Sequence, residues 1–389
     1  MMKPYAKRMS RMGTESAFEA LARARALEKE GKKILHFEIG EPDFPTAPHI
    51  IEAAKKALDA GYTHYVPAPG IPEVREAVCD YIQATRGFRP DQNQVMISPG
   101  AKPILFFVLM AICDKGEQVI YQDPGFPIYE SMIRYLGGKP VPVRLKQKNG
   151  FRMTPEDVVK KVRDKTKLII LNTPHNPTGA VSTEEDVKAL SELCREKGIW
   201  LLADEVYHKF LYEGKHFSPC VYDRCLDHTI LMDGLSKTYA MTGWRLGFGV
   251  MPAELHAHVT RLTINSVSCT SAFSQMAVKE ALLGPQDASV AMVEEFRRRR
   301  DVIVKGLNEV KGFRCENPGG AFYVFPNIKK LHTPSKEVEL HLLNDLGIAC
   351  LSGTAFGKGG EGYLRFSYAS SLDNINAMVD ILKKEYGTR

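Results

Sequence analysis

Short apolar runs alternate with stretches of helical periodicity through the middle of this chain. From about residue 94, β-rich runs of four or five residues are separated by longer segments in which apolar positions recur every three or four residues. This alternation predicts βα units around a mainly parallel sheet. The expected strands are 94–97, 117–121, 167–171, 199–203, 229–232 and 246–250. The expected helices include 101–113, 127–138 and 182–197, the last opening with a capping box of Ser182 and Glu185.

The pattern changes after about residue 290. A long charged helix is followed by short strand candidates at 321–325 and 363–368 and by a closing helix, which predicts a smaller α+β domain. The first 45 residues hold an amphipathic helix and the loop GEPDFPTAP, and they do not begin the βα alternation. We therefore expect an α/β protein with a large domain of residues 46–289 and a small domain formed by 1–45 and 290–389.

Composition agrees with a folded protein that binds small molecules. Hydrophobic residues make up 44% and charged residues 25% of the 389 positions, so a sizeable core can form. The net charge of +6 favours small anions mildly and is weak support for nucleic acid binding. The densest basic run, Arg297 to Arg300, follows Glu294 and Glu295 and is expected to be a solvated helix face.

The cysteines and the apolar segments bear on the compartment. Eight cysteines occur without C-x-x-C pairs and mostly within apolar stretches, which predicts buried free thiols in a reducing compartment. The N-terminus has no apolar core of secretory length, and no later stretch approaches a membrane span of roughly 20 apolar residues. We expect a cytoplasmic protein.

Several common motifs are absent. The string GTAFGKGG from Gly353 is one residue short of a phosphate-binding P-loop and is expected to be a turn. The glycines at 243, 247 and 249 have the wrong spacing for a dinucleotide fingerprint. No H-E-x-x-H occurs, and His175 and His208 stand alone, so no metal site is expected.

Three polar residues stand at or near predicted strand ends, where a parallel sheet binds ligands. Asp204 ends the apolar run of IWLLADEVY, and a carboxylate there needs a compensating positive charge such as a protonated pyridine nitrogen, or else it caps a helix. Tyr207 follows one turn later, so its hydroxyl can face the same ligand. Lys237, in DGLSKTYAMTGWRLGF, lies in a turn between two predicted strands. By itself this position suits a surface lysine as well as a catalytic one.

Three further strings are suggestive. SPGAK, residues 98–102, joins a strand to an apolar helix, whose free N–H groups favour an anion such as phosphate. NTPHNPTG, residues 172–179, ends a buried strand in a turn. In YLRFSYA, period-two alternation turns Arg365 away from the more apolar face, where it can pair with a substrate carboxylate or form a structural salt bridge.

Taken in order, these strings resemble a known family. GEPDFP, Y-x-x-x-x-G, SPGAK, DPGFPIY, NTPHNPTG, ADEVY, GLSKTYAMTGWRLGF and YLRFSYA are similar to the class I aminotransferases of the fold type I pyridoxal-phosphate enzymes, over nearly the whole chain. The resemblance implies pyridoxal 5'-phosphate as the cofactor. It also implies transfer of an amino group between L-amino acids and 2-oxo acids, with 2-oxoglutarate as the expected acceptor.

The resemblance assigns roles to individual positions. Lys237 matches the lysine that forms a Schiff base with the cofactor aldehyde and then moves the proton between Cα and C4'. Asp204 matches the carboxylate that keeps the pyridine nitrogen protonated. Asn176 and Tyr207 match the donors to the phenolic oxygen, and Phe126 matches the ring stacked on the cofactor.

Further matches define the two ends of the ligand site. The phosphate clamp corresponds to the N–H groups of Ala101 and Lys102 together with Ser236 and Arg245. Tyr65 resembles the tyrosine that reaches the phosphate of a neighbouring subunit, which implies a homodimer. The substrate α-carboxylate matches Arg365, helped by the backbone of Gly40 and by Asn176.

Some positions depart from the family pattern and some questions stay open. Gly234 stands where several relatives have a phosphate-binding serine, and Phe126 replaces a more usual tryptophan or tyrosine. A carbon–sulfur β-lyase, a decarboxylase or a cofactor-binding regulator on the same scaffold are the alternatives. The preferred amino donor is undetermined, because Lys102, Arg11 and Arg261 are equally good candidates for a second carboxylate-binding cation.

Overall fold

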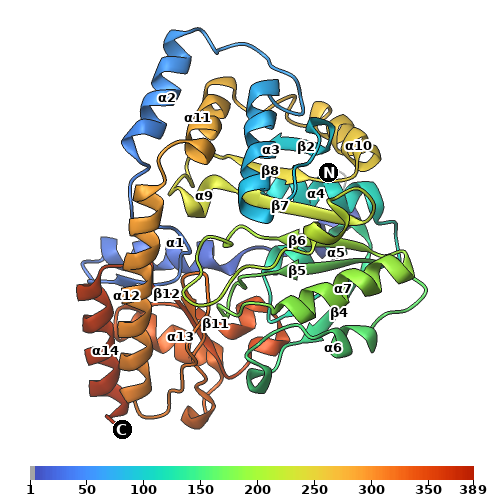
Figure 1. Cartoon of the computed structure of the whole chain (residues 1–389). Coiled ribbons are helices and arrows are strands. Elements are labelled where there is room, and N and C mark those ends of the chain that lie inside the picture. Colours follow the sequence, from blue (N-terminus) through green and yellow to red (C-terminus); the bar gives the residue numbers. More distant parts are fainter. Residues whose placement is uncertain (1–4) are drawn as a thin grey trace, which may run out of the picture.

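The computed structural model describes residues 5–389, so the first four residues of the predicted segment 1–45 lie outside the described part. A seven-stranded sheet with the order β2-β8-β7-β6-β5-β3-β4 forms its centre (Figure 1). The strands from β3 to β7 run parallel, and β8 runs antiparallel to both of its neighbours. This confirms the mainly parallel sheet. The strands are β2 (Val95–Ser98), β3 (Gln118–Asp123), β4 (Lys139–Arg144), β5 (Thr166–Asn172), β6 (Trp200–Asp204), β7 (Thr229–Gly234) and β8 (Gly247–Val250).

Strand β4 is the one strand of this sheet that the hydrophobic pattern did not predict. Its sequence KPVPVR contains two prolines, and of its residues only Val143 is buried. It lies at the edge of the sheet and pairs with β3 alone, and an edge strand tolerates proline because one side of its backbone needs no ladder partner.

Helices pack on both faces of the sheet and around its ends. They are α2 (Pro48–Asp59), α3 (Pro72–Arg86), α4 (Lys102–Ile112), α5 (Pro127–Leu136), α6 (Pro155–Val159), α7 (Glu184–Lys197), α8 (Cys220–Asp223), α9 (Leu235–Thr238), α10 (Ala253–Ile264) and α11 (Ala272–Leu283). Short 3-10 turns are η1 (Lys7–Arg11), η2 (Gln92–Gln94), η3 (Gln147–Asn149), η4 (Lys329–Leu331), η5 (Gly353–Phe356) and η6 (Lys358–Gly360). The last two contain the P-loop-like string, which is a turn as expected.

The predicted capping box of α7 is wrong. Ser182 is still part of the connection, and its N–H donates to Thr173 Oγ1 at 3.0 Å. The N-cap is Thr183, whose hydroxyl accepts from the N–H of Asp186 at 3.2 Å. The helix starts one residue later because the tertiary contact with Thr173 holds Ser182 in the connection.

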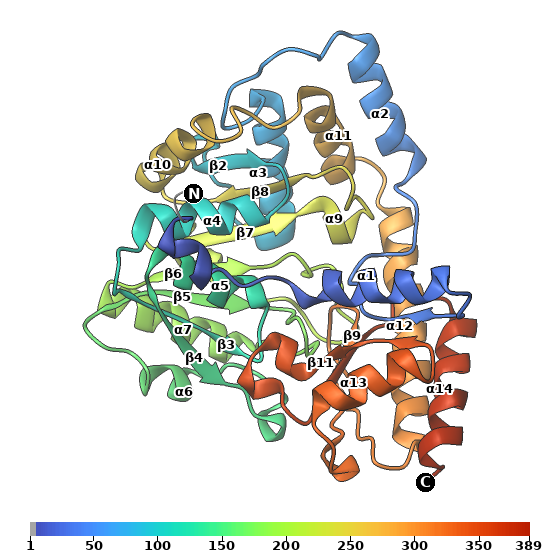
Figure 2. The same cartoon turned by 180° about the vertical axis from the view of Figure 1, so that it is seen from behind.

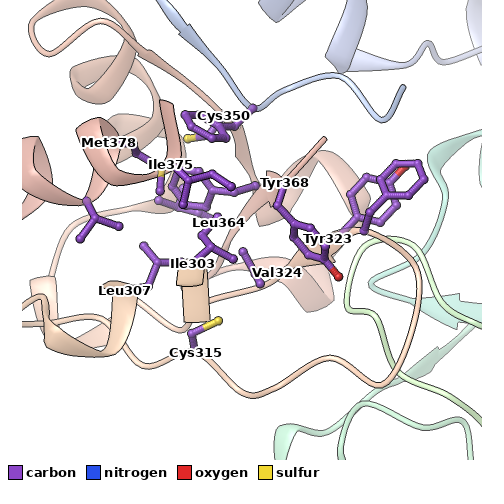
Figure 3. Close-up of a cluster of buried hydrophobic side chains, with 14 of the residues drawn as sticks. Ile303, Leu307, Cys315, Tyr323, Val324, Cys350, Leu364, Tyr368, Ile375 and Met378 are labelled. Atoms are coloured by element: carbon purple, nitrogen blue, oxygen red, sulfur yellow. The ribbon is translucent and has the colours of Figure 1, made fainter. Parts of the chain in front are cut away.

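The second unit contains small sheets and longer helices. β11 (Leu351–Ser352), β12 (Leu364–Ser367) and β9 (Tyr323–Val324) form an antiparallel sheet, and β1 (Leu35–His36) pairs in parallel with β10 (Ile348–Ala349). Its helices are α1 (Ser16–Lys29), α12 (Asp287–Glu309), α13 (Ser335–Asn344) and α14 (Leu372–Tyr386). Figure 3 shows part of its core, which includes Ile303, Leu307, Leu364, Ile375 and Met378. This grouping supports our proposed domains of 46–289 and of 1–45 with 290–389.

The N-terminal segment touches both units. Gly13 exchanges hydrogen bonds with the Ser131 hydroxyl on α5, at 3.0 and 3.1 Å, and Arg11 donates to the Tyr135 carbonyl at 3.0 Å. Figure 2 shows this segment beside α4 and α5 before α1 crosses towards the second unit. It therefore bridges the two units.

The expectation that the arginine run of α12 is a solvated face is half wrong. Arg298 is largely exposed and Arg297 is half-buried, but the side chains of Arg299 and Arg300 are only 8% and 5% exposed. Arg299 lies 5.2 Å from the centre of the Phe44 ring and pairs with Asp43, while Arg300 lies over the Tyr212 ring at 4.8 Å. Guanidinium groups can be buried when aromatic faces and carboxylates receive them.

Candidate active site

A cavity of about 520 Å³ opens where three parallel strands end. Asn172, Asp204 and Gly234 are the last residues of β5, β6 and β7, and all three line it. The carboxyl edge of an open parallel sheet is where such folds bind ligands. The predicted residues that line the cavity are Gly40, Ala101, Lys102, Phe126, Asn176, Asp204, Tyr207, Ser236, Lys237, Arg245 and Arg365. Tyr65 is 88% exposed and does not line it, so its role towards a second subunit stays a prediction.

Lys237 projects into this cavity from the single turn of α9. Its Nζ donates to the carbonyl of Gly40 at 2.6 Å. Burial lowers the pKa of this amine to about 8, although the carboxylates of Glu41 and Glu15 oppose the shift. At pH 7 this amine is therefore neutral in about a tenth of the protein molecules. The neutral amine is the form that attacks a carbonyl carbon.

Asp204 is buried at the end of β6. The Tyr129 hydroxyl donates to its carboxylate, and the Val206 N–H reaches it at 3.4 Å. A turn rather than a helix follows, so helix capping does not explain the carboxylate. Burial raises its pKa to about 7, with Asp233 and Glu205 adding repulsion, while the Tyr129 bond opposes the rise. A cation beside Asp204 would relieve this unfavourable burial.

A buried ion network lies behind Asp204, and sequence reasoning missed it. The Arg86 guanidinium contacts Glu205 at 3.0 Å and Asp233 at 2.8 Å. His216 contacts Glu205 at 2.9 Å, and His208 contacts Asp233 at 3.2 Å. Burial opposes the charge of Glu205, yet His216 and Arg86 lower its pKa to about 2. These partners come from distant segments, so no local spacing revealed them.

Arg365 lies on β12, buried between two aromatic rings. Its guanidinium carbon is 4.6 Å from the centre of the Tyr323 ring and 4.8 Å from that of Phe356. Nη1 donates to Asn176 Oδ1 at 3.3 Å, and Nη2 donates to the carbonyl of Glu38. Its buried Nε has no partner among the described residues. Arg365 also lines the cavity, so it has the unused donor capacity that a carboxylate ligand requires.

Tyr207 and Tyr323 form a hydroxyl pair above the cavity. Their oxygens are 2.7 Å apart, and burial raises the pKa of both. Tyr323 was not among the predicted site residues. The close approach of its hydroxyl explains Gly40, where a Cβ atom would overlap Tyr323. The signal available in the sequence was the string GGAFYVF, which by itself reads as a strand.

The opposite end of the cavity is built for an anion. Ala101 is the N-cap of α4 and Lys102 its first residue, so their N–H groups lack partners within the helix. Ser236 and Arg245 line the same cavity. A Cβ atom at Gly100 would overlap the Arg245 guanidinium, so this glycine lets the cation approach the start of α4. Helix N-termini with a nearby cation bind phosphate well.

Comparison with known proteins defines the class. The family model described as "Aminotransferase class I and II" matches residues 32–382. A probable aspartate/prephenate aminotransferase of Aquifex aeolicus is 38% identical over 99% of both chains. Aromatic-amino-acid aminotransferase 2 of Thermococcus litoralis is 39% identical over 90% of this chain and 91% of its own. The aspartate aminotransferase of Thermus thermophilus, solved with maleate, superposes with a TM-score of 0.93 at 34% identity, covering 98% of this chain and 100% of that one.

The fold and the cavity thus define a fold type I enzyme, and the chain belongs to the class I and II aminotransferases. It is a pyridoxal-phosphate-dependent aminotransferase similar to the aspartate aminotransferases.

The residues present fit this cofactor. A lysine amine, a buried carboxylate and a helix start with an arginine line one cavity, and they match the aldehyde, the ring nitrogen and the phosphate of pyridoxal phosphate. The cavity volume lies within the range of ordinary cofactor sites.

Residues 5–389 contain no group of three or more His, Cys, Asp or Glu side chains arranged to hold a metal. No helix in the same range is both long and apolar enough to cross a membrane.

Proposed function

We propose that Lys237 carries the cofactor and acts as the general base of amino transfer. The observation that carries this proposal is its amine, whose pKa burial lowers to about 8, inside the cavity that the buried carboxylate of Asp204 and the guanidinium of Arg365 also line. When bound, pyridoxal phosphate supplies an electron sink for the charge left when the Cα proton is removed. Lys237 would take that proton at Nζ and return it to carbon C4' of the cofactor.

The remaining residues hold and polarise the ligand. Asp204 would accept a hydrogen bond from the ring N–H and keep that nitrogen charged. Asn176 and Tyr207 would donate to the phenolic oxygen, and Phe126 would pack against the ring. The N–H groups of Ala101 and Lys102, with Ser236 and Arg245, would hold the phosphate. Support for this arrangement comes from their shared cavity.

Arg365 binds the substrate α-carboxylate, together with Asn176 and the backbone of Gly40. Two parallel N–H···O bonds from a guanidinium fix the plane of a carboxylate. A fixed carboxylate turns the Cα–H bond towards Lys237, so proton removal is favoured over loss of carbon dioxide. The unpartnered Nε of Arg365 supports this role.

The substrates are an L-amino acid and a 2-oxo acid, with 2-oxoglutarate as the acceptor. Relatives named for aspartate, aspartate/prephenate and aromatic substrates support this class of reaction and leave the amino donor open.

We further propose a cytoplasmic homodimer. The exposed Tyr65 supports the dimer, since its hydroxyl is free to reach the phosphate in a second subunit. The eight free cysteines suit a reducing compartment.

Borohydride reduction of the holoprotein followed by peptide mapping tests the central assignment. The cofactor should be fixed on Lys237, and Lys237→Ala should keep binding cofactor while losing turnover by many orders of magnitude. Adding amino donors to the wild type should bleach the absorbance of the aldehyde form. A label on another side chain would overturn the role of Lys237. Release of pyruvate and ammonia from cystathionine without an acceptor would assign a β-lyase instead.

A further inference from the structure

One cation of the cavity has no role in the proposed reaction. The cationic side chains that line the cavity within the described residues are Lys102, Lys237, Arg245 and Arg365. In the proposed reaction Lys237 binds the cofactor aldehyde, Arg245 binds the phosphate and Arg365 binds the substrate α-carboxylate. Only the N–H of Lys102 is needed for the phosphate, so its ammonium group is left for the substrate side chain. Of the other candidates from the sequence, Arg11 donates to Tyr135 and neither it nor Arg261 lines the cavity.

The Lys102 ammonium is already paired with an acidic residue. Its Nζ lies 2.5 Å from Glu15 Oε2, with side chains that are 47% and 22% exposed. Glu15 occupies the N-cap position of α1, but its carboxylate accepts no hydrogen bond from that helix. A polar side chain at an N-cap ordinarily serves the free helix N–H groups. Here the carboxylate instead pairs with Lys102, and both residues line the cavity.

The backbone around Glu15 is anchored to the large domain. Two residues earlier, Gly13 both donates to and accepts from the Ser131 hydroxyl on α5. Arg11 adds the bond to the Tyr135 carbonyl on the same helix. The negative charge of Glu15 is therefore held beside Lys102 by the fold.

The cavity also has apolar lining. Ala17 and Phe18 follow Glu15 on α1, Leu105 lies one turn after Lys102 on α4, and all three line the cavity together with Ile39. An uncharged substrate side chain meets apolar surface and a cation that is already neutralised. A second substrate carboxylate must instead displace Glu15 from Lys102 and then lie close to the Glu15 charge. Specificity often comes from such a repulsive element as much as from attraction.

We propose that Glu15 is a specificity-determining residue, an internal counter-ion that biases this aminotransferase towards substrates with uncharged side chains and against dicarboxylates. The inference rests on the proposed function, because it concerns the side-chain end of the same site. Dicarboxylates such as 2-oxoglutarate and L-aspartate still react, but each must first open the Glu15–Lys102 pair.

The test compares Glu15→Gln with Glu19→Gln in the holoenzyme. Glu19 lies four residues further along α1, is exposed and does not line the cavity, so it gives the same charge change away from the site. Half-reactions are measured with L-aspartate and L-glutamate, and with L-alanine and L-phenylalanine. Glu15→Gln should raise kcat/KM for the acidic donors about five- to tenfold relative to the neutral ones, mainly through KM. Glu19→Gln should leave the ratio unchanged.

A double variant identifies the group that receives the second carboxylate. Adding Lys102→Met to Glu15→Gln should abolish the gain for acidic donors, because the freed ammonium is what binds them. A ratio within twofold of the wild type in Glu15→Gln, or a gain that survives Lys102→Met, would overturn the inference. Failure of the wild type to react with any amino acid would reject the proposed function itself. Normal transamination with an unchanged ratio would reject only the role of Glu15.

Discussion

Replacing Asp204 by Asn should stabilise the cofactor-free protein at alkaline pH while weakening cofactor binding. Asp204 is buried, and in the absence of a cation its burial raises its pKa from an ordinary 3.8 to about 7. Asparagine has a similar shape, and its side-chain oxygen can still accept a hydrogen bond from the Tyr129 hydroxyl. The substitution therefore removes the ionisation with little change in packing.

The sign and size of the effect follow from proton linkage. The folded apoprotein keeps a proton on Asp204 that the unfolded chain loses from about pH 4, so the free energy of unfolding falls as the pH rises towards 7. A shift of roughly three pKa units corresponds to about 4 kcal/mol at pH 8, as an order of magnitude. Asp204→Asn has no such ionisation, so its free energy of unfolding does not fall for this reason. Its advantage over the wild type should be small near pH 4 and grow to its full size above pH 7.

Urea unfolding of both apoproteins at pH 5, 6, 7 and 8 measures the difference. Asp380→Asn, which removes an exposed carboxylate on α14, is the matched control and should show no pH-dependent gain. In the holoproteins the order should reverse, because the ring cation compensates Asp204 and not Asn. Parallel pH profiles for wild-type and Asp204→Asn apoproteins would refute the reasoning.

Three further predictions concern the substrate, the buried network and acid stability. Arg365→Lys should raise KM for every amino acid on the order of a hundredfold in steady-state assays, because an ammonium cannot form the bidentate carboxylate pair; an unchanged KM would place the α-carboxylate elsewhere. Arg86→Leu removes the guanidinium shared by the buried carboxylates of Glu205 and Asp233 and should lower the free energy of unfolding by about 3–5 kcal/mol in urea titrations, whereas a neutral result would mean that the network relaxes. Burial lowers the pKa of His208 to about 4, so the unfolded state binds more protons between roughly pH 6.5 and 4. Stability from this histidine should be lost as the pH falls through that window, and His208→Gln should flatten the loss in acid-unfolding curves.

The local strings determined much of the site in advance. Lys237, Asp204 and Arg365 were each singled out by their place in a strand or turn, and all three line one cavity. This succeeded because β5, β6 and β7 are continuous apolar runs whose ends are easy to locate. Parallel strands then bring their carboxyl ends to one edge of the sheet.

Other features depended on packing that no local pattern reports. Arg299 and Arg300 are buried because aromatic rings from other segments receive their guanidinium groups. Tyr323 enters the site because β9 pairs with β12 beside Arg365. Neither contact has a characteristic spacing along the chain.

Strand and helix periods, turn residues and the charge at strand ends are local properties, so the sequence alone was enough to predict the parallel sheet and to place Asp204 at a strand end and Lys237 in a turn between two strands. Which charges neutralise one another is a matter of distance in space. The Arg86 network and the Glu15–Lys102 pair join residues separated by up to 147 positions, and only the tertiary structure decided them. Coulomb energy depends on separation and burial, which the linear order of residues does not contain.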